Sequence, residues 1–137
     1  MKKAIKYFAF ALMIVVAGSM TAMSQTGSKN SLGAAPNDFQ AQWAHDDGFL
    51  MDIRTPDEYM AANLAHSKLC SFNDQSFASI LDMLDKNKAV YVYDQNGANI
   101  AKVLDMMSKK GFKKVVALQG GIDAWMKAGL PVVNMKK

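Results

Sequence analysis

The chain has 137 residues, enough for one compact domain with some additional sequence and too few for two domains of ordinary size. It carries 16 basic and 12 acidic residues, a formal net charge of +4. Three of the lysines fall in residues 1–24, which hold no acid, so the rest of the chain is nearly neutral at +1. This balance argues against the strongly basic surface of a nucleic-acid-binding protein.

Residues 1–24 combine a basic start, an apolar run over residues 7–17 and small residues after it. This pattern predicts a secretory signal peptide, with cleavage after Ala22-Met23-Ser24. A membrane anchor is the less favoured alternative, because the apolar run is shorter than the ~20 residues needed to cross a bilayer. We therefore expect export to the periplasm, or to the outside of the cell, with no membrane attachment after cleavage.

Residues 25–35 are small and polar and show no periodicity, which predicts a flexible linker. The pattern changes at Pro36, where we place the start of a single domain, residues 36–134, followed by a short tail, residues 135–137. Asn37 can cap a short helix that carries Phe39 and Trp43 on one face.

The next segments alternate between strand and helix patterns. Residues 49–53 form an apolar run of strand length. Thr55, Pro56 and Glu58 predict a helix start, with a capping box between the threonine and the glutamate. Residues 67–70 are a weaker strand candidate, and the next helix is predicted from apolar residues at helical spacing, namely Phe77, Ile80, Leu81 and Leu84.

Residues 89–93 are rich in β-branched and aromatic side chains on both alternation faces, which favours an interior parallel strand. The pattern then predicts a helix over residues 100–107 ended by Gly111, a strand over 115–118, a turn at 119–121 and a helix over 122–127. Such alternation predicts an α/β fold, a parallel sheet covered by helices on both faces. Ligands bind such sheets at the carboxyl ends of the strands, where residues 94–99 lie.

Two motifs resemble the signatures of the rhodanese family, the thiosulfate sulfurtransferases and their relatives. Residues 52–59, DIRTPDEY, resemble the first signature, D-x-R-x-x-x-E-Y, and residues 120–132, GGIDAWMKAGLPV, resemble the closing one. The similarity extends from Pro36 to Val133. It implies a rhodanese-like three-layer α/β/α fold with a central, mostly parallel sheet of about five strands, and an active loop after the central strand that begins with cysteine, in the manner of C-R-S-G-N-R-S.

Asp94 stands where this resemblance places the cysteine. Gln95 and Asn99 occupy positions where active members often carry arginine, whereas Gly97 matches the pattern and Ile100 replaces a small hydroxyl residue. The active-site-like loop is therefore made up of Asp94, Gln95, Asn96, Gly97, Ala98 and Asn99. A member of the family takes a sulfur atom onto a thiolate. A carboxylate forms no stable persulfide, so the sequence predicts no catalytic residue.

Asp94 is expected instead to accept hydrogen bonds from the loop N–H groups and to cap the helix that follows. An acyl-phosphate role for this carboxylate is disfavoured, because such chemistry usually brings Mg²⁺ and further carboxylates. Asp52 and Arg54 are expected to form a buried or half-buried pair that orients the loop.

Cys70 is the single cysteine, so no intramolecular disulfide can form. It can be a reactive thiol, pair between chains or fill the core, and we favour the buried interpretation. His45 and His66 lack the spacing of metal ligands, so neither a metal nor another cofactor is expected.

Two hypotheses follow. The first is an exported, catalytically inactive rhodanese-like domain that acts as a binding or regulatory module for a protein, a peptide or a small molecule. The alternative is a weak sulfurtransferase or sulfur-relay protein that uses Cys70. The sequence leaves the question of catalysis open and favours the first hypothesis because of Asp94.

Overall fold

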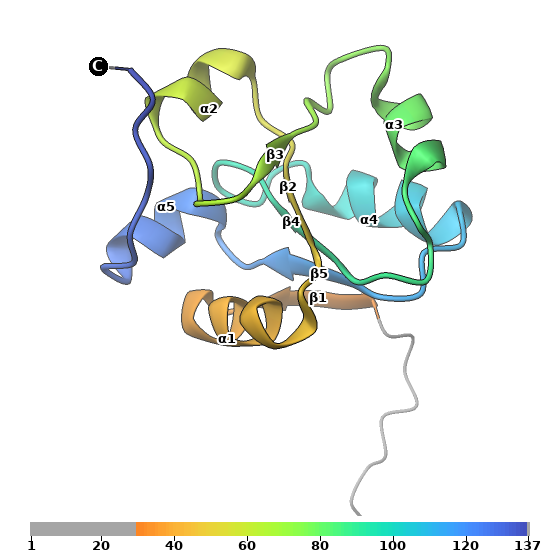
Figure 1. Ribbon diagram of the computed structural model, residues 1–137, viewed down its shortest axis with the longest axis horizontal. Coiled ribbons are helices and arrows are strands. Elements are labelled where there is room, and N and C mark those ends of the chain that lie inside the picture. Colours follow the sequence, from red (N-terminus) through yellow and green to blue (C-terminus); the bar gives the residue numbers. More distant parts are fainter. Residues whose placement is uncertain (1–29, 137) are drawn as a thin grey trace, which may run out of the picture.

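The computed structural model describes residues 30–136 and alternates strands with helices along the chain (Figure 1). The elements are β1 (Asn30–Ala34), α1 (Pro36–Asp46), β2 (Phe49–Asp52), α2 (Pro56–Ala61), β3 (Lys68–Leu69), α3 (Phe77–Met83), β4 (Val90–Tyr93), α4 (Ile100–Lys109), β5 (Val115–Leu118) and α5 (Gly121–Lys127). None of the helices in this range is long and apolar enough to span a membrane.

The strands form one five-stranded sheet in the order β1-β5-β4-β2-β3, and each neighbouring pair is parallel. Helices α1 and α5 pack on one face of the sheet and α3 and α4 on the other. The expected α/β fold with a parallel sheet between two helical layers is confirmed. Because all strands run the same way, their carboxyl ends share one edge, and the loop after β4 lies at that edge.

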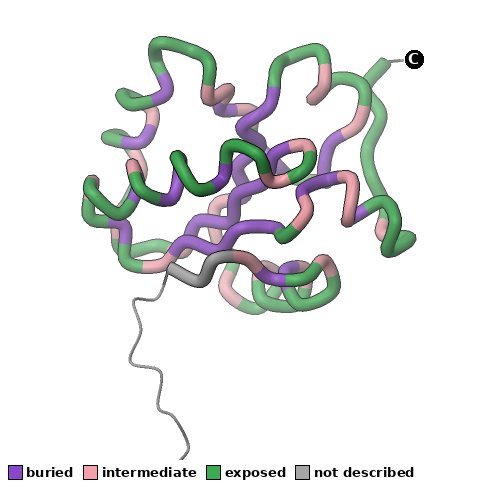
Figure 2. The backbone as a smooth tube through the Cα atoms, turned by 180° about the vertical axis from the view of Figure 1, so that it is seen from behind, coloured by how far each residue is buried: buried purple, intermediate pink, exposed green. Residues whose placement is uncertain are grey.

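Strand β4 lies in the interior of the sheet and serves two separate cores. Tyr91 and Tyr93 point into the core under α1 and α5, whereas Val90 and Val92 point into the core under α3 and α4. All four side chains are buried, as the strand's apolar residues on both faces predicted. In Figure 2 the buried positions run along the central strands, and the outer turns of the helices are exposed.

The linker prediction is wrong for residues 30–34, because they form β1. This strand pairs with β5 at the edge of the sheet, and the Ala34 carbonyl accepts the Gln119 N–H at 2.9 Å. Edge pairing uses backbone groups, which small residues supply as well as apolar ones do, and the register shifts between Ser31 and Ala34, where Gly33 has a φ of 134°. The predicted signal peptide and residues 25–29 lie outside the described residues.

Two boundaries at the ends of the domain also differ from the predictions. Helix α1 begins at Pro36 with Ala35 as N-cap and no side-chain cap, so the expected capping role of Asn37 is wrong. Proline at the first helical position supplies the helical φ without a cap. At the other end the Met135 N–H donates to the Met60 carbonyl at 3.1 Å, so the attached chain extends into the predicted tail.

The predicted start of α2 is confirmed in detail. Glu58 N–H donates to the Thr55 hydroxyl at 3.4 Å, and the Glu58 carboxylate accepts the Thr55 N–H at 2.9 Å. The Thr55 hydroxyl also donates to the Glu58 carboxylate at 2.8 Å, and the hydrogen bonds that this carboxylate accepts from the Thr55 N–H and hydroxyl lower the pKa of Glu58. The box fixes the point at which the chain turns away after Arg54.

Candidate functional site

Asp94 follows β4 directly and is almost completely buried, with 3 % of its surface exposed. Its Oδ1 accepts the Gly97 N–H at 2.5 Å and its Oδ2 accepts the Asn99 N–H at 3.0 Å. The Asn96 side-chain oxygen takes the Ala98 N–H at 3.1 Å. Three successive N–H groups of the loop are therefore bound by oxygens of the loop itself.

The predicted hydrogen bonds to the Asp94 carboxylate are thus confirmed, but their partners lie before the helix. Asn99 is the N-cap residue of α4, and its side chain makes no capping hydrogen bond. Asp94 therefore closes the loop that leads into α4. Neither of its two hydrogen bonds reaches the first turn of that helix.

The backbone of the loop is held from the other side by the start of α5. Ile122 N–H donates to the Asp94 carbonyl at 2.9 Å, and Asp123 N–H donates to the Gln95 carbonyl at 3.1 Å. Gly121 has a φ of 64°, and a Cβ there would lie 2.4 Å from the Gln95 carbonyl oxygen. The closing motif therefore contains glycine at this position because two backbone segments approach too closely for a side chain.

Asp52 and Arg54 form a buried pair at the end of β2, as predicted. Their side chains are 0 % and 4 % exposed, and the guanidinium contacts the carboxylate through Nε at 3.1 Å and Nη2 at 2.8 Å. Burial works against the charge, but the hydrogen bonds and charge of Asp52 outweigh it and raise the pKa of Arg54. The guanidinium also lies 5.6 Å from the centre of the Tyr93 ring.

The same arginine reaches the loop. Its Nη1 donates to the Gln95 side-chain oxygen at 2.9 Å, and the Gln95 amide nitrogen donates to the Asp123 carboxylate at 2.6 Å. The sequence prediction that Asp52 and Arg54 orient the loop agrees with these contacts. The sequence prediction missed Asp123, which accepts the hydrogen bond from the Gln95 amide. The available signal was the place of Asp123 inside the closing motif, in the first turn of α5.

Cys70 follows β3 and lies in the core between the sheet and helices α3 and α4, with 5 % of its surface exposed. The interpretation of this cysteine as a buried residue is confirmed. Burial, with a contribution from the charge of Asp52, raises the pKa of Cys70 to about 11. The thiol therefore stays protonated near neutral pH and is a poor nucleophile.

The two histidines lie at the surface, and the His66 ring stands 6.2 Å from the Trp43 ring. Within residues 30–136 no group of histidine, cysteine, aspartate and glutamate side chains is arranged to hold a metal ion.

Comparison with known proteins places these features in a family. A sequence model of the rhodanese-like domain matches residues 35–128. The thiosulfate sulfurtransferase GlpE of Vibrio cholerae serotype O1 is 28% identical over 97 residues, covering 70% of this chain and 89% of that protein. A sulfurtransferase of Allochromatium vinosum is 28% identical over 88 residues, covering 64% and 80%.

Solved structures agree in fold. A rhodanese-related protein from Thermoplasma volcanium superposes with a TM-score of 0.64 at 23% identity, covering 74% of this chain and 96% of that one. A rhodanese-like domain protein from Staphylococcus aureus gives a TM-score of 0.60 at 21% identity, covering 68% and 89%.

Proposed function

The chain belongs to the rhodanese-like domain family, and from this premise we propose that it is an exported member that does not transfer sulfur and acts as a binding or regulatory module. Relatives with 28% identity are named sulfurtransferases, so sulfur transfer is the activity against which the proposal is weighed. The observation that carries it is the buried carboxylate of Asp94, which is bound by the N–H groups of its own loop.

The chemistry of sulfur transfer supports this proposal. A thiolate attacks the outer sulfur of a donor such as thiosulfate, a sulfur–sulfur bond forms on the protein, and sulfite leaves with the electron pair of the bond that breaks. The resemblance places this thiolate at position 94. A carboxylate there offers only oxygen, and an acyl–sulfur adduct would not store sulfur as a persulfide does.

The hydrogen bonds of the loop also support the proposal that the chain does not transfer sulfur. Inward N–H groups at a helix amino terminus bind anions. Here the N–H groups of Gly97, Ala98 and Asn99 already have oxygen acceptors, and the charge of Asp94 would repel a second anion. Arg54 is engaged by Asp52 and Gln95. The loop is thus better suited to a neutral ligand, a peptide or a protein surface than to thiosulfate.

The alternative, a weak sulfurtransferase or sulfur-relay protein that uses Cys70, has less support. That thiol lies in the apolar core, and its raised pKa leaves little thiolate at neutral pH. A sulfur donor would have to enter the space between the sheet and α3 to reach it.

One enzymatic experiment separates the two proposals. Thiocyanate formation from thiosulfate and cyanide is measured for the wild type, Asp94→Cys and Cys70→Ser. We expect no turnover above background for the wild type and Cys70→Ser, and we expect Asp94→Cys to gain sulfur, seen as a mass increase of one sulfur atom and as thiocyanate. Asp105→Cys, which places a thiol on the exposed surface of α4, is the matched control and should gain no turnover.

Turnover by the wild type that disappears in Cys70→Ser would replace the proposal with the Cys70 alternative. Turnover by the wild type that survives in Cys70→Ser would refute both, since no other thiol exists in the chain.

Export is part of the proposal and is supported by the pattern of residues 1–24. When the chain is expressed in a bacterium with a periplasm, its intact mass in the periplasmic fraction should correspond to a chain that begins at Gln25. Recovery of the uncleaved chain in the cytoplasm alone would contradict export.

A further inference from the structure

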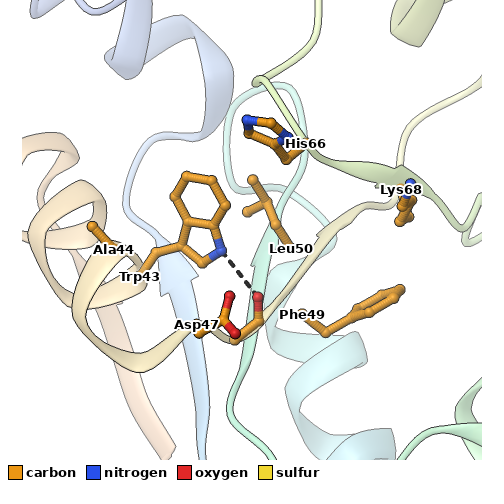
Figure 3. A pocket seen from close by; sticks show the side chains of 8 residues that line it. Trp43, Ala44, Asp47, Phe49, Leu50, His66 and Lys68 are labelled. Carbon is orange, nitrogen blue, oxygen red and sulfur yellow. Dashed lines mark hydrogen bonds between the residues drawn. The ribbon is translucent and has the colours of Figure 1, made fainter.

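A hollow of about 620 Å³ opens at the amino-terminal edge of the sheet, at the end opposite the loop of Asp94 (Figure 3). Its size is within the range of small-molecule sites, about 300–1,000 Å³. It lies between the end of α1, the start of β2 and the start of β3. Its walls include Trp43, Asp47, Phe49, Leu50, His66 and Lys68.

The ladder between β2 and β3 stops short of one backbone donor beside this hollow, the N–H of Leu50. The N–H groups of Phe49 and Ile53 bind carbonyls on the β4 side of β2, so by alternation the N–H of Leu50 points to the β3 side. Pairing with β3 begins only at Met51 opposite Lys68. Among residues 30–136 no hydrogen bond joins the Leu50 N–H to a backbone carbonyl outside the strands, although Leu50 is only 3 % exposed.

A tight turn explains why the ladder stops there. The Ser67 N–H donates to the Leu64 carbonyl at 3.0 Å, and His66 sits in this turn with a φ of 67°. The chain that would continue β3 toward the amino edge is therefore turned away from β2. In the described part of the chain, the two non-glycine residues with positive φ are His66 and Asp47, and both line the hollow.

The walls combine apolar rings with one charge of each sign. The indole N–H of Trp43 already donates to the Gly48 carbonyl at 3.0 Å, so Trp43 offers the ligand a ring and no donor. Figure 3 shows Lys68 and Asp47 on different sides of the hollow. An anionic group would be attracted toward Lys68 and repelled by Asp47, which fixes its orientation.

We propose that this hollow binds a small carboxylate with an aromatic body. The carboxylate accepts the Leu50 N–H and pairs with the Lys68 ammonium, and the ring lies against Trp43. One backbone N–H beyond the end of the ladder matches one carboxylate. A peptide strand added to β2 would need several open ladder positions, and β3 already occupies that edge from Met51 onward.

The test uses 3-phenylpropanoate as the probe and follows backbone amide resonances of the full chain during titration. We expect saturable shifts of Leu50 and Lys68, and binding at least about tenfold weaker for the neutral 3-phenylpropan-1-ol, which lacks the charge-assisted hydrogen bond. Lys68→Met should weaken binding about tenfold on the same ground. Lys102→Met, an exposed lysine on α4, should leave binding unchanged.

His66→Gly supplies a second variant that should keep the fold, because glycine adopts a φ of 67° more readily than histidine does. It removes the ring next to Trp43 and should weaken binding of the probe. The proposal is overturned if the alcohol binds as tightly as the acid, if Lys68→Met behaves like Lys102→Met, or if millimolar probe leaves the Leu50 amide unshifted.

Discussion

At the scale of single residues, the position of a carboxylate decides what it can do. Asp94 accepts two N–H groups of its own loop and is buried with them, so its charge is balanced by backbone donors. Asp52 is balanced by the guanidinium of Arg54. Both were identified as site residues from the sequence. The partners of Asp94 were not, because which N–H groups converge depends on the path of the loop.

Asp46 gives a prediction about pH at this scale. Its carboxylate pairs with the Lys114 ammonium, accepts the Tyr91 hydroxyl at 2.5 Å and lies 3.2 Å from the His45 Nδ1. These contacts, with Lys114 the strongest, hold the pKa of Asp46 well below its usual value. A lowered folded-state pKa adds stability above the unfolded pKa, near 4, and this stability is lost as the pH falls toward the folded value.

We therefore expect Asp46→Asn to reduce the free energy of unfolding by about 1–2 kcal/mol at pH 7. The difference from the wild type should shrink between about pH 5 and pH 2, as measured by urea unfolding at several pH values. Asp105→Asn, which removes an exposed pair with Lys109, should change stability by less than about 0.5 kcal/mol. A difference for Asp46→Asn that stays constant with pH would contradict the assignment.

At the scale of elements, the loop after β4 takes its shape from α5 as much as from its own residues. The first N–H groups of α5 donate to the carbonyls of Asp94 and Gln95. Gly121 permits this contact, because a Cβ would enter the space of the Gln95 carbonyl. The two family motifs, residues 52–59 and 120–132, are therefore joined through Gln95 of the loop, which accepts a hydrogen bond from Arg54 and donates one to Asp123.

A pair of glycine substitutions tests this contact. Gly121 and Gly129 both have positive φ, 64° and 75°, but a Cβ at Gly129 would meet nothing within 4 Å. Gly129→Ala should cost about 1–2 kcal/mol of unfolding free energy from backbone strain alone. Gly121→Ala should cost about 2–3 kcal/mol more, because the loop or the helix must move. Equal losses in denaturant unfolding would show that the close approach is not a constraint.

At the scale of the whole molecule, one sheet separates two cores, and its edges are closed in different ways. Strand β1 covers the edge of β5, and β3 covers only part of the edge of β2. The segment after α5 returns to the other end of the domain, where Val133 pairs with Asn63. Segments that lie far apart in the chain therefore complete the domain at both ends.

The contribution of β1 can be measured with two truncations. A chain that begins at Asn30 keeps every described strand and should unfold at a temperature close to that of the protein that begins at Gln25. A chain that begins at Pro36 lacks β1, exposes the edge of β5 and removes the buried Ala34. We expect it to unfold at a lower temperature and to self-associate through the open edge. Equal unfolding temperatures for the two truncations would restore the interpretation of residues 30–34 as a linker.

The sequence by itself determined the alternation of strands and helices, the family, the capping box at Thr55 and the residue at the head of the loop. These features depend on local pattern, on neighbours within a few positions and on motifs written in the chain. Tertiary structure decided that residues 30–34 form a strand, that Gln95 links Arg54 to Asp123, and that β3 pairs with β2 only from Met51 onward. Each of these depends on which distant backbone comes close, and the periodicity of a segment carries no information about its partner.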